Sequence, residues 1–414
     1  MSSDLTNVTA PEPDVSKLAQ STLPEETPIQ ALTTRLRRGD VGQLPAILML
    51  IAIVVVFEIT SGGFFLYPVN LSNLILQEAS TAIIAMGAVL VLLLAEIDLS
   101  LAAVAYLCGA VMTTLSVYSH WSAPLALLAG LLAGLVVGVI NGFFVAVMRI
   151  PSFIVTLAAY IFYSGLLLHI LLPNTTIRLY DPALTGIMAN YVTFPWDVLA
   201  PVPVILIYAG ALLYDRSRRA RMGLRLEPVW SLWTRIGVVV ILTVAALTVF
   251  ESAFGVPYSM FIVMGLLILL WLLLRFTTYG RHLYAVGGSP EAARRAGINV
   301  TVMRISVFAL ASMLAGLGGI LESSRTISAQ ADVDPRLLLL AIAVAVIGGV
   351  SLFGGRGSIW GVVLGILIIG CLENGLTLLS ATGTDLKYML EGAVLLVAVL
   401  LDALTRRRSA VSGR

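Results

Sequence analysis

Residues 44–57 read LPAILMLIAIVVVF, without a single charged side chain. Comparable apolar runs recur at 236–250, 261–274 and 394–401. With their mildly polar flanks, these runs approach the roughly 20 residues that an α-helix needs to cross the hydrocarbon core of a bilayer. Hydrophobic residues make up 59% of the 414 positions and charged residues only 12%, more apolar side chain than a soluble core of this size needs. The sequence therefore predicts an all-α integral membrane protein.

The apolar runs and their flanks predict about 12 membrane-spanning helices. They are expected at 44–66, 71–94, 99–118, 122–148, 152–172, 196–214, 232–254, 257–274, 302–321, 337–353, 359–380 and 388–404. If the N-terminus is cytoplasmic, only four of the 25 Lys and Arg residues fall outside the cell: Arg178, Arg325, Arg336 and Lys387. Membrane proteins carry such an excess of basic residues in their cytoplasmic loops. Both termini are therefore predicted to be cytoplasmic.

Two tails flank the predicted membrane domain, which covers 44–405. Residues 1–43 are rich in Pro, Thr, Ser and Glu, and predict a disordered cytoplasmic tail. Residues 406–414 form a second, basic cytoplasmic tail. The first apolar run begins only near Leu44 and has no small-residue cleavage pattern, so we expect the first span to be retained.

The spans contain two internal patterns. Glycines at 130, 134, 138 and 142 form a smooth ridge on the fourth span, where a neighbouring helix can approach closely. GVING at 138–142 is echoed by GCLENG at 370–375, which fits either a pseudo-repeat of two halves or chance. Glu96 and Asp98 interrupt the apolar stretch between the second and third spans, so a broken or re-entrant helix is an alternative there.

Nothing in the sequence predicts covalent chemistry. Neither Lys17 nor Lys387 lies in the Gly-rich Gly-Lys-Ser/Thr pattern that cradles nucleotide phosphates. The three histidines are too widely spaced for a metal pair on one helix. Cys108 and Cys371 lie in apolar spans and are predicted to be buried apolar side chains. We therefore expect no enzymatic activity, no metal site and no cofactor bound by this chain.

The stretch GGSPEAARRAGIN at 287–299 follows the rules of helix ends in order. The serine suits the N-cap, the proline and glutamate suit the first turn, the arginines suit the last turn, and the glycine can take the left-handed stop. The predicted helix, about seven residues long, involves Ser289, Pro290, Glu291, Ala292, Ala293, Arg294, Arg295, Ala296 and Gly297. So short a helix is marginal in water, so we expect a partner protein or the membrane surface to hold it. The alternative is an ordinary surface turn.

At this point the chain resembles a known family. The stretch YGRHLYAVGGSPEAARRAGIN at 279–299 closely resembles the coupling loop of monosaccharide permeases of ATP-binding-cassette (ABC) importers. Further segments agree in the expected order: IDLS at 97–100, RIPSFIVTL at 149–157, IGGVS at 347–351 with GGRGS at 354–358, and Asn374-Gly375. Together they cover most of residues 70–405. The resemblance implies the ABC importer permease fold, with a cytoplasmic coupling loop at 275–304 that docks on a separate ATPase subunit, where ATP is used.

Within that family the chain is similar to xylose-type permeases. Ribose-type permeases pass from a span like 196–214 almost directly to the coupling loop, whereas this chain inserts an Arg-rich loop and two spans. The stretches LEP at 226–228 and GTDLKY at 383–388 also look xylose-type, so D-xylose is the first substrate expected. One departure is that relatives commonly carry Gly before the IDLS motif, where this chain has Glu96. The backbone path there, and any substrate contact, stay open.

Polar side chains in or beside spans are candidates for a translocation path, because an unpaired charge is costly in a membrane. The candidates are Glu96, Asp98, Ser100, Asn141 and Asn374. Asp98 and Ser100 can equally cap a broken helix. The two Asn amides can equally bridge helices. Four more glutamates fall in or beside spans and are open to either use: Glu58, Glu78, Glu373 and Glu391.

The resemblance implies further partners and a location in the bacterial inner (plasma) membrane. We expect a dimer with a second permease copy, two docked ATPase subunits, and delivery of sugar by an extracytoplasmic binding protein. The arginines at 216–221 are expected to meet lipid headgroups, and no nucleic acid is expected as a partner.

Several rival hypotheses remain at this stage. One is an ion-coupled sugar symporter that uses Glu96 or Asp98 as its proton carrier. Another is an ABC permease for a different monosaccharide. Branched-chain amino-acid permeases are the nearest alternative family. A membrane scaffold or receptor without transport is disfavoured by the Gly-rich helices and the intramembrane polar groups.

Overall fold

The computed structural model describes residues 44–379 except 224, 225 and 227, together with a few separate positions between 385 and 396. The predicted tails at 1–43 and 406–414 lie outside the described residues. So does most of the twelfth predicted span, at 388–404, including Glu391, and so does Lys387 just before it.

Each of the first eleven predicted spans corresponds to a helix in the described part of the chain. Eight helical segments are long and apolar enough to cross a membrane: α4 (Pro68–Leu93), α6 (Ala123–Ala146), α7 (Ser152–Leu171), α9 with α10 (Trp196–Leu199 and Pro201–Arg221), α11 (Val229–Glu251), α12 (Tyr258–Phe276), α15 (Val300–Thr326) and α17 (Gly361–Leu378). Three are apolar but shorter: α3 (Leu44–Thr60), α5 (Leu101–Val117) and α16 (Pro335–Ile347). The chain is a multi-span helical membrane protein; the number twelve is not settled by these residues.

Some helix boundaries differ from the predicted ones. The span predicted at 196–214 continues as helix α10 to Arg221, because a helix need not end where its apolar stretch ends. The span predicted at 337–353 ends earlier, at Ile347. Gly349 and Gly354, with φ of 87° and 77°, follow it in a conformation that a right-handed helix does not contain.

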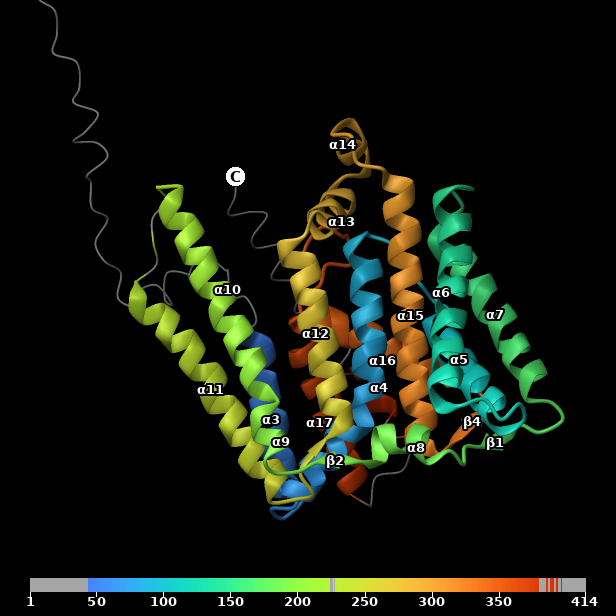
Figure 1. The fold of residues 1–414 in the computed structure, drawn as a ribbon, viewed down its shortest axis with the longest axis horizontal. Helices are drawn as coiled ribbons and strands as arrows, with labels where there is room; N and C mark the ends of the chain where they lie inside the picture. Colours follow the sequence, from blue (N-terminus) through green and yellow to red (C-terminus); the bar gives the residue numbers. More distant parts are fainter. Residues whose placement is uncertain are drawn as a thin grey trace, which may run out of the picture. The chain divides into compact units, whose positions relative to one another are not determined.

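Short elements join the helices at their two ends (Figure 1). α13 (Thr278–Gly288) and α14 (Pro290–Arg295) lie at one end, called the α14 end below. Two antiparallel strand pairs, which the sequence did not predict, lie at the opposite end with α8 (Pro182–Ala189). The pairs are β1 (Thr176–Arg178) with β4 (Ser328–Gln330) and β2 (Tyr191–Val192) with β3 (Val256–Pro257).

Helix α15 lies at the centre of the packing and contacts α4, α5 and α6. The glycine ridge of α6 explains the close approach of α15, as predicted. A Cβ atom added at Gly134 would lie 2.8 Å from the carbonyl oxygen of Ser312, and one added at Gly142 would lie 2.8 Å from the Cα of Ile305. The two backbones therefore lie closer together than they could if these positions carried any side chain larger than a hydrogen atom.

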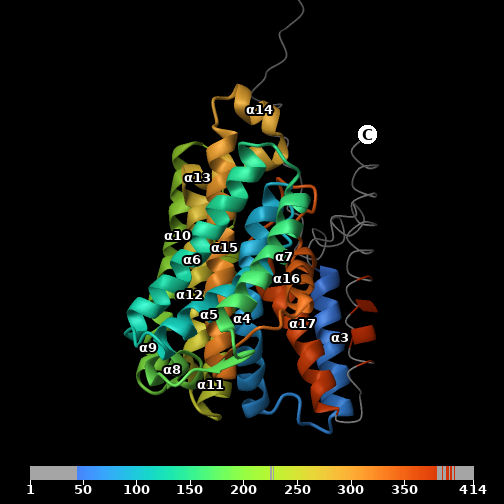
Figure 2. The same cartoon turned by 90° about the vertical axis from the view of Figure 1, so that its right-hand side faces the viewer.

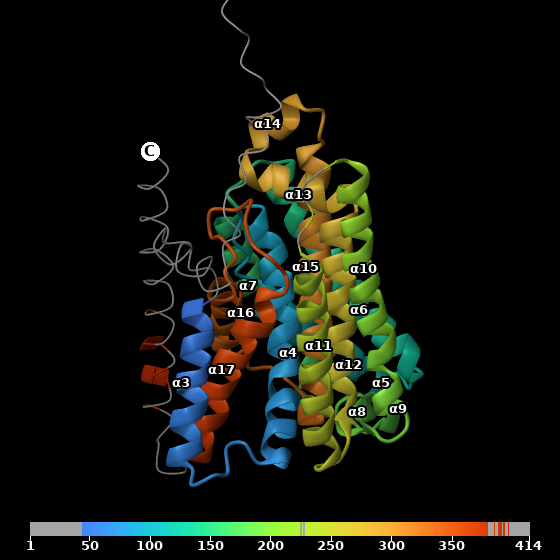
Figure 3. The ribbon, with the colours of Figure 1, turned by 90° about the vertical axis from the view of Figure 1, so that its left-hand side faces the viewer.

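The remaining helices pack around this centre. α16 packs on α4 and α17, and α17 carries α3 on its other side (Figure 2). α10 and α11 form a hairpin (Figure 3) in which Phe250 is the only buried residue among those described. Within the described part of the chain nothing else covers the hairpin, so its surface is open to lipid or to another chain.

Candidate functional site

Helix α14 has the predicted ends, over six residues instead of about seven. The hydroxyl of Ser289 accepts a hydrogen bond from the backbone N–H of Ala292 at 3.3 Å. Glu291 lies in the first turn, and Gly297, with φ of 83°, follows the C-cap in the left-handed region. The N-cap bond and the left-handed glycine satisfy backbone groups that a helix leaves free at its ends.

One side of α14 is anchored and the other is exposed. Ala293 is buried against α13 and α15, and its carbonyl accepts from the N–H of Ile298 at 3.0 Å. The exposed residues of α14 are Glu291, Ala292, Arg294 and Arg295. Figure 1 shows the helix projecting beyond its neighbours at this end. A partner at the α14 end would therefore meet a short, firmly held helix that bears both charge signs.

Helix α13, which directly precedes α14, is joined to two other segments. Gly287 of α13 packs against the end of α4, where a Cβ atom would overlap the carbonyl oxygen of Leu93. The N–H of Gly355 donates to that same carbonyl at 2.9 Å. The Tyr284 hydroxyl donates to the carbonyl of Gly357 at 2.9 Å, and burial raises the pKa of this phenol, so it stays protonated at neutral pH. Helices α13 and α14, the end of α4 and the 354–358 loop thus form one contact group.

Glu96 lies at the α14 end, in an ion pair. Helix α4 ends at Leu93, and Ala95 takes a φ of 62°. A carboxylate oxygen of Glu96 then lies 2.9 Å from the guanidinium of Arg304, on the first turns of α15. Both side chains are mostly buried, so the pair is screened less than one on an open surface. Next to it is a cavity of about 490 Å³ that Glu96, Arg294 and Arg304 help to line.

Asp98, Ser100 and Asn141 come together as a buried hydrogen-bonded chain. The Asp98 carboxylate accepts from both the N–H and the hydroxyl of Ser100, at 2.8 and 2.6 Å. The Ser100 hydroxyl accepts from the Asn141 amide at 3.0 Å, and Asn141 in turn accepts from the hydroxyl of Tyr163 at 3.0 Å. All four side chains are at most 5% exposed. The chain ties the start of α5 to α6 and α7, and these contacts fit the helix-capping interpretation of Asp98.

Two residues of α7 complete the break between α4 and α5. The Ser152 hydroxyl accepts from the N–H of Ile97 at 3.2 Å, and the Thr156 hydroxyl accepts from the N–H of Leu99 at 3.0 Å. A helix break inside a membrane protein needs such partners for its free backbone groups. Neither hydroxyl was predicted from the sequence, although both lie in the RIPSFIVTL segment at 149–157.

The other polar residues in the spans lie apart from this chain. The Asn374 amide oxygen on α17 accepts from the Asn70 amide on α4 at 2.8 Å, so it bridges two helices. Glu373 is paired with Arg336 at 3.0 Å. Glu58 accepts from the N–H of Leu66 at 2.8 Å, and Glu78 is buried on α4. Of the five predicted path residues, the structure therefore brings together three.

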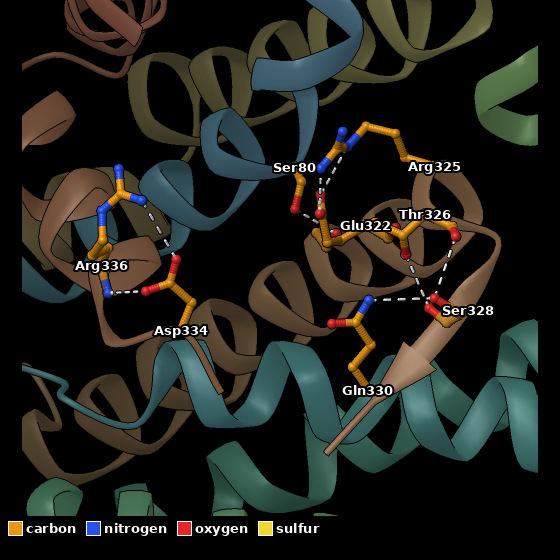
Figure 4. A network of polar contacts seen from close by, with 9 residues as sticks. Ser80, Glu322, Arg325, Thr326, Ser328, Gln330, Asp334 and Arg336 are labelled. Carbon is orange, nitrogen blue, oxygen red and sulfur yellow. Dashed lines mark hydrogen bonds and ion pairs between the residues drawn. The ribbon is translucent and has the colours of Figure 1, made fainter. Parts of the chain in front are cut away.

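A polar network that was not predicted from the sequence lies at the end opposite α14 (Figure 4). It follows the last turn of α15 into β4 and on to α16. Glu322 and Arg325 pair at 2.6 Å, Thr326 donates to the carbonyl of Ser328 at 3.0 Å, and Asp334 accepts from the N–H of Arg336 at 2.9 Å. The sequence carries a signal for this network, because residues 322–336 form a strongly polar stretch between the predicted spans at 302–321 and 337–353.

This network surrounds a small cavity of about 30 Å³, roughly the volume of one water molecule in the liquid. Its lining includes Tyr106 of α5 together with Glu322, Ser323 and Gln330. Hydroxyl, amide and carboxylate groups of this kind both donate to and accept from an uncharged polar solute. Among the described residues, no group of three or more His, Cys, Asp or Glu side chains is placed to bind a metal ion.

Comparison with known proteins decides the family. Residues 70–399 match the family described as "Branched-chain amino acid transport system / permease component". The chain belongs to this family of permeases. The match covers the α14 end, the Asp98 chain and the 322–336 network alike, so these features belong to one permease domain.

Individual relatives of this permease are named for sugars. It is 35% identical to the xylose transport system permease protein of Escherichia coli strain K12, over 87% of this chain and 91% of the relative. It is 33% identical to the xylose permease of Haemophilus influenzae, over 88% and 98%. It is 32% identical to the ribose import permease of Bacillus subtilis, over 90% and 95%. No solved structure matches the chain significantly.

Proposed function

We propose that this chain is the membrane-spanning subunit of an ATP-driven monosaccharide importer, with D-xylose as its first substrate. The observation that carries the proposal is the match of nearly the whole chain to permeases named for xylose, ribose and fructose. All three are monosaccharides, which supports the class of substrate. The choice of xylose rests on the higher identity of the xylose permeases and on the inserted loop and two spans, which are α11 and α12 in the structure.

A separate ATPase subunit is proposed to dock at the α14 end, which would face the cytoplasm. The exposed side of α14 offers Glu291, Arg294 and Arg295 to a partner, while its buried side rests on α13 and α15. A displacement of α14 would be passed on through α13 to the end of α4 and to the 354–358 loop, because these segments form one contact group. The chain itself has no Gly-Lys-Ser/Thr phosphate loop, so ATP would be used only on the partner.

The sugar is proposed to enter at the opposite end from an extracytoplasmic binding protein. The 322–336 network lies there and presents hydroxyl and amide groups, which suit sugar hydroxyls. Both of its guanidinium groups are paired with carboxylates, Arg325 with Glu322 and Arg336 with Asp334 and Glu373, so both charge signs occur there. A second copy of the permease would complete the path between two such surfaces.

Accumulation of radiolabelled D-xylose tests this proposal. The chain is expressed with its binding protein and ATPase, and uptake is measured with and without a protonophore while ATP is maintained. Uptake that survives the protonophore and requires the ATPase is the expected result. Collapse with the protonophore would support an ion-coupled symporter instead. ATPase-dependent uptake of another sugar only would retain the importer and reject xylose.

A further inference from the structure

A large basic cavity at the α14 end lies between the α10–α11 hairpin and helices α12 and α13. Its volume is about 760 Å³, within the range of roughly 300–1,000 Å³ typical of ligand pockets. Five arginines line it: Arg216, Arg219, Arg235, Arg275 and Arg281. Asp215 is the one carboxylate among the described lining residues, and it is paired with Arg219 at 3.2 Å. Arginines therefore outnumber carboxylates among the described lining residues, although Arg216 and Arg235, like Arg219, have partners of their own.

Two of these arginines are available to a ligand. Arg275, at the end of α12, and Arg281, in α13, are exposed. Neither forms an ion pair with any residue that the structure describes, whereas Arg219 is already neutralised by Asp215. A guanidinium group binds phosphate oxygens through paired N–H donors in a fixed geometry. The charge of the cavity thus matches a phosphate group.

The other walls of the cavity are apolar and aromatic. Leu212 and Leu274 line it, and Trp271 lies at its side with ring centroids 6.3 Å from Tyr208 and 6.1 Å from Trp360. Tryptophan and tyrosine gather where the hydrocarbon core of a bilayer meets the headgroups. The cavity therefore has a cationic part at headgroup level and an apolar part below it, in the order that a phospholipid presents.

Lipid can reach this cavity from the side. Helix α10 has no buried residue and α11 has only Phe250, at its far end. Their apolar surfaces, which include Leu206, Ile241 and Leu242, are exposed by about two-thirds. One wall of the cavity is therefore a hairpin that already faces the bilayer. A soluble ligand would need no such apolar wall.

We propose that this cavity binds the phosphate headgroup of an anionic phospholipid, held chiefly by Arg275 and Arg281, and so fastens the α10–α11 hairpin to α12 and α13. Basic pockets between membrane helices are suited to anionic headgroups. The site is separate from the surface of α14 and from the 322–336 network, and it does not depend on which solute the permease transports.

Native mass spectrometry of the full chain, purified in detergent, tests the proposal with added phosphatidylglycerol or phosphatidylcholine. The unaltered protein is expected to retain phosphatidylglycerol in preference to phosphatidylcholine. The double variant Arg275→Gln/Arg281→Gln is expected to lose roughly 10- to 30-fold in affinity for phosphatidylglycerol. The matched control is Arg149→Gln/Arg178→Gln, which removes the same charge from two exposed positions outside the cavity, and which should retain the lipid.

Three results would overturn the assignment. One is equal retention of the two lipids by the unaltered protein, a comparison that does not depend on the folding of any variant. Another is an equal loss in the cavity variant and the control, which would mean that general surface charge attracts the lipid. A third is displacement of phosphatidylglycerol by inorganic phosphate, which would mean that the cavity takes a soluble phosphate.

Discussion

The hydroxyl group of Ser100 links three helices. It donates to the carboxylate of Asp98 and accepts from the amide of Asn141, whose oxygen accepts from Tyr163. Every one of these groups is buried, so none can turn to water if its partner is removed. A buried polar group left unsatisfied costs about 1–3 kcal/mol, more when it is charged.

Replacing Ser100 should therefore destabilise the protein. Ser100→Ala removes a donor from Asp98 and an acceptor from Asn141, and we expect a loss of about 1–3 kcal/mol, measured as a lower thermal unfolding midpoint in detergent. The control is Ser217→Ala on α10, an exposed serine whose hydroxyl donates only to the carbonyl of Leu213. Equal midpoints for the two variants would contradict the structural role given to the Asp98 chain.

At the level of elements, the contact between α6 and α15 depends on the absence of side chains. A Cβ atom at Gly138 would lie 2.6 Å from the Cα of Ala309, a distance that two backbones cannot relieve without moving apart. Gly165 on α7 is also in the interior of a span, yet a Cβ atom added there would meet nothing within 4 Å. The two glycines therefore differ only in what lies opposite them.

We expect Gly138→Ala to destabilise the permease by about 1–3 kcal/mol, because it overpacks the α6–α15 contact. Gly165→Ala should be neutral or mildly stabilising, because alanine has the higher helix propensity. Thermal unfolding of both variants in detergent gives the comparison. If the two variants unfold at similar temperatures, whether or not these differ from the midpoint of the unaltered protein, then helix propensity and not packing governs these positions.

The exposed Glu291 allows a test of the docking role proposed for helix α14. Glu291→Lys reverses the charge of an exposed first-turn residue without touching the buried Ala293. If the ATPase docks here, xylose uptake should fall at least about tenfold while the variant remains in the membrane at normal levels. The control is Glu251→Lys at the far end of α11, which makes the same change of charge at an exposed position away from α14. Unchanged uptake in Glu291→Lys would reject the docking assignment.

On the scale of the whole molecule, the two ends differ in how their arginines are neutralised. At the end with the strand pairs, Arg325 and Arg336 are both paired with carboxylates. At the α14 end, Arg275 and Arg281 have no such pairing among the described residues. The cytoplasmic side of a membrane protein is enriched in Lys and Arg, whether or not carboxylates pair with them. The orientation expected from the sequence therefore stays a prediction.

Cysteine labelling tests that orientation. The native Cys108 and Cys371 are 0% and 5% exposed, so background labelling should be low. In intact cells, a membrane-impermeant maleimide should label Asn174→Cys, which is exposed near β1, and should not label Ala292→Cys on α14. Ala292→Cys should become reactive only after the cells are permeabilised. The reverse pattern would place α14 outside the cell and exclude its role in ATPase docking.

The sequence by itself determined the features that depend on neighbours along the chain. Eleven apolar stretches predicted eleven described helices, because the bilayer demands long apolar segments and the backbone can satisfy itself only as helix there. The ends of α14 followed from Ser289 and Gly297, and the glycine ridge of α6 predicted a close helix contact. The number twelve and the two tails stay predictions.

Only the tertiary structure decided which polar groups meet. Asn374 bonds to Asn70, 304 positions away in the sequence, and Ser80 bonds to the carbonyl of Gly318, 238 positions away. Glu96 is a path candidate from sequence, and only the fold gives it Arg304 as a partner. The basic cavity likewise needs α10 to lie across from α13. Hydropathy fixes how deeply a residue lies in the membrane, whereas its partner depends on which helices pack together, and that is decided by contacts between distant segments.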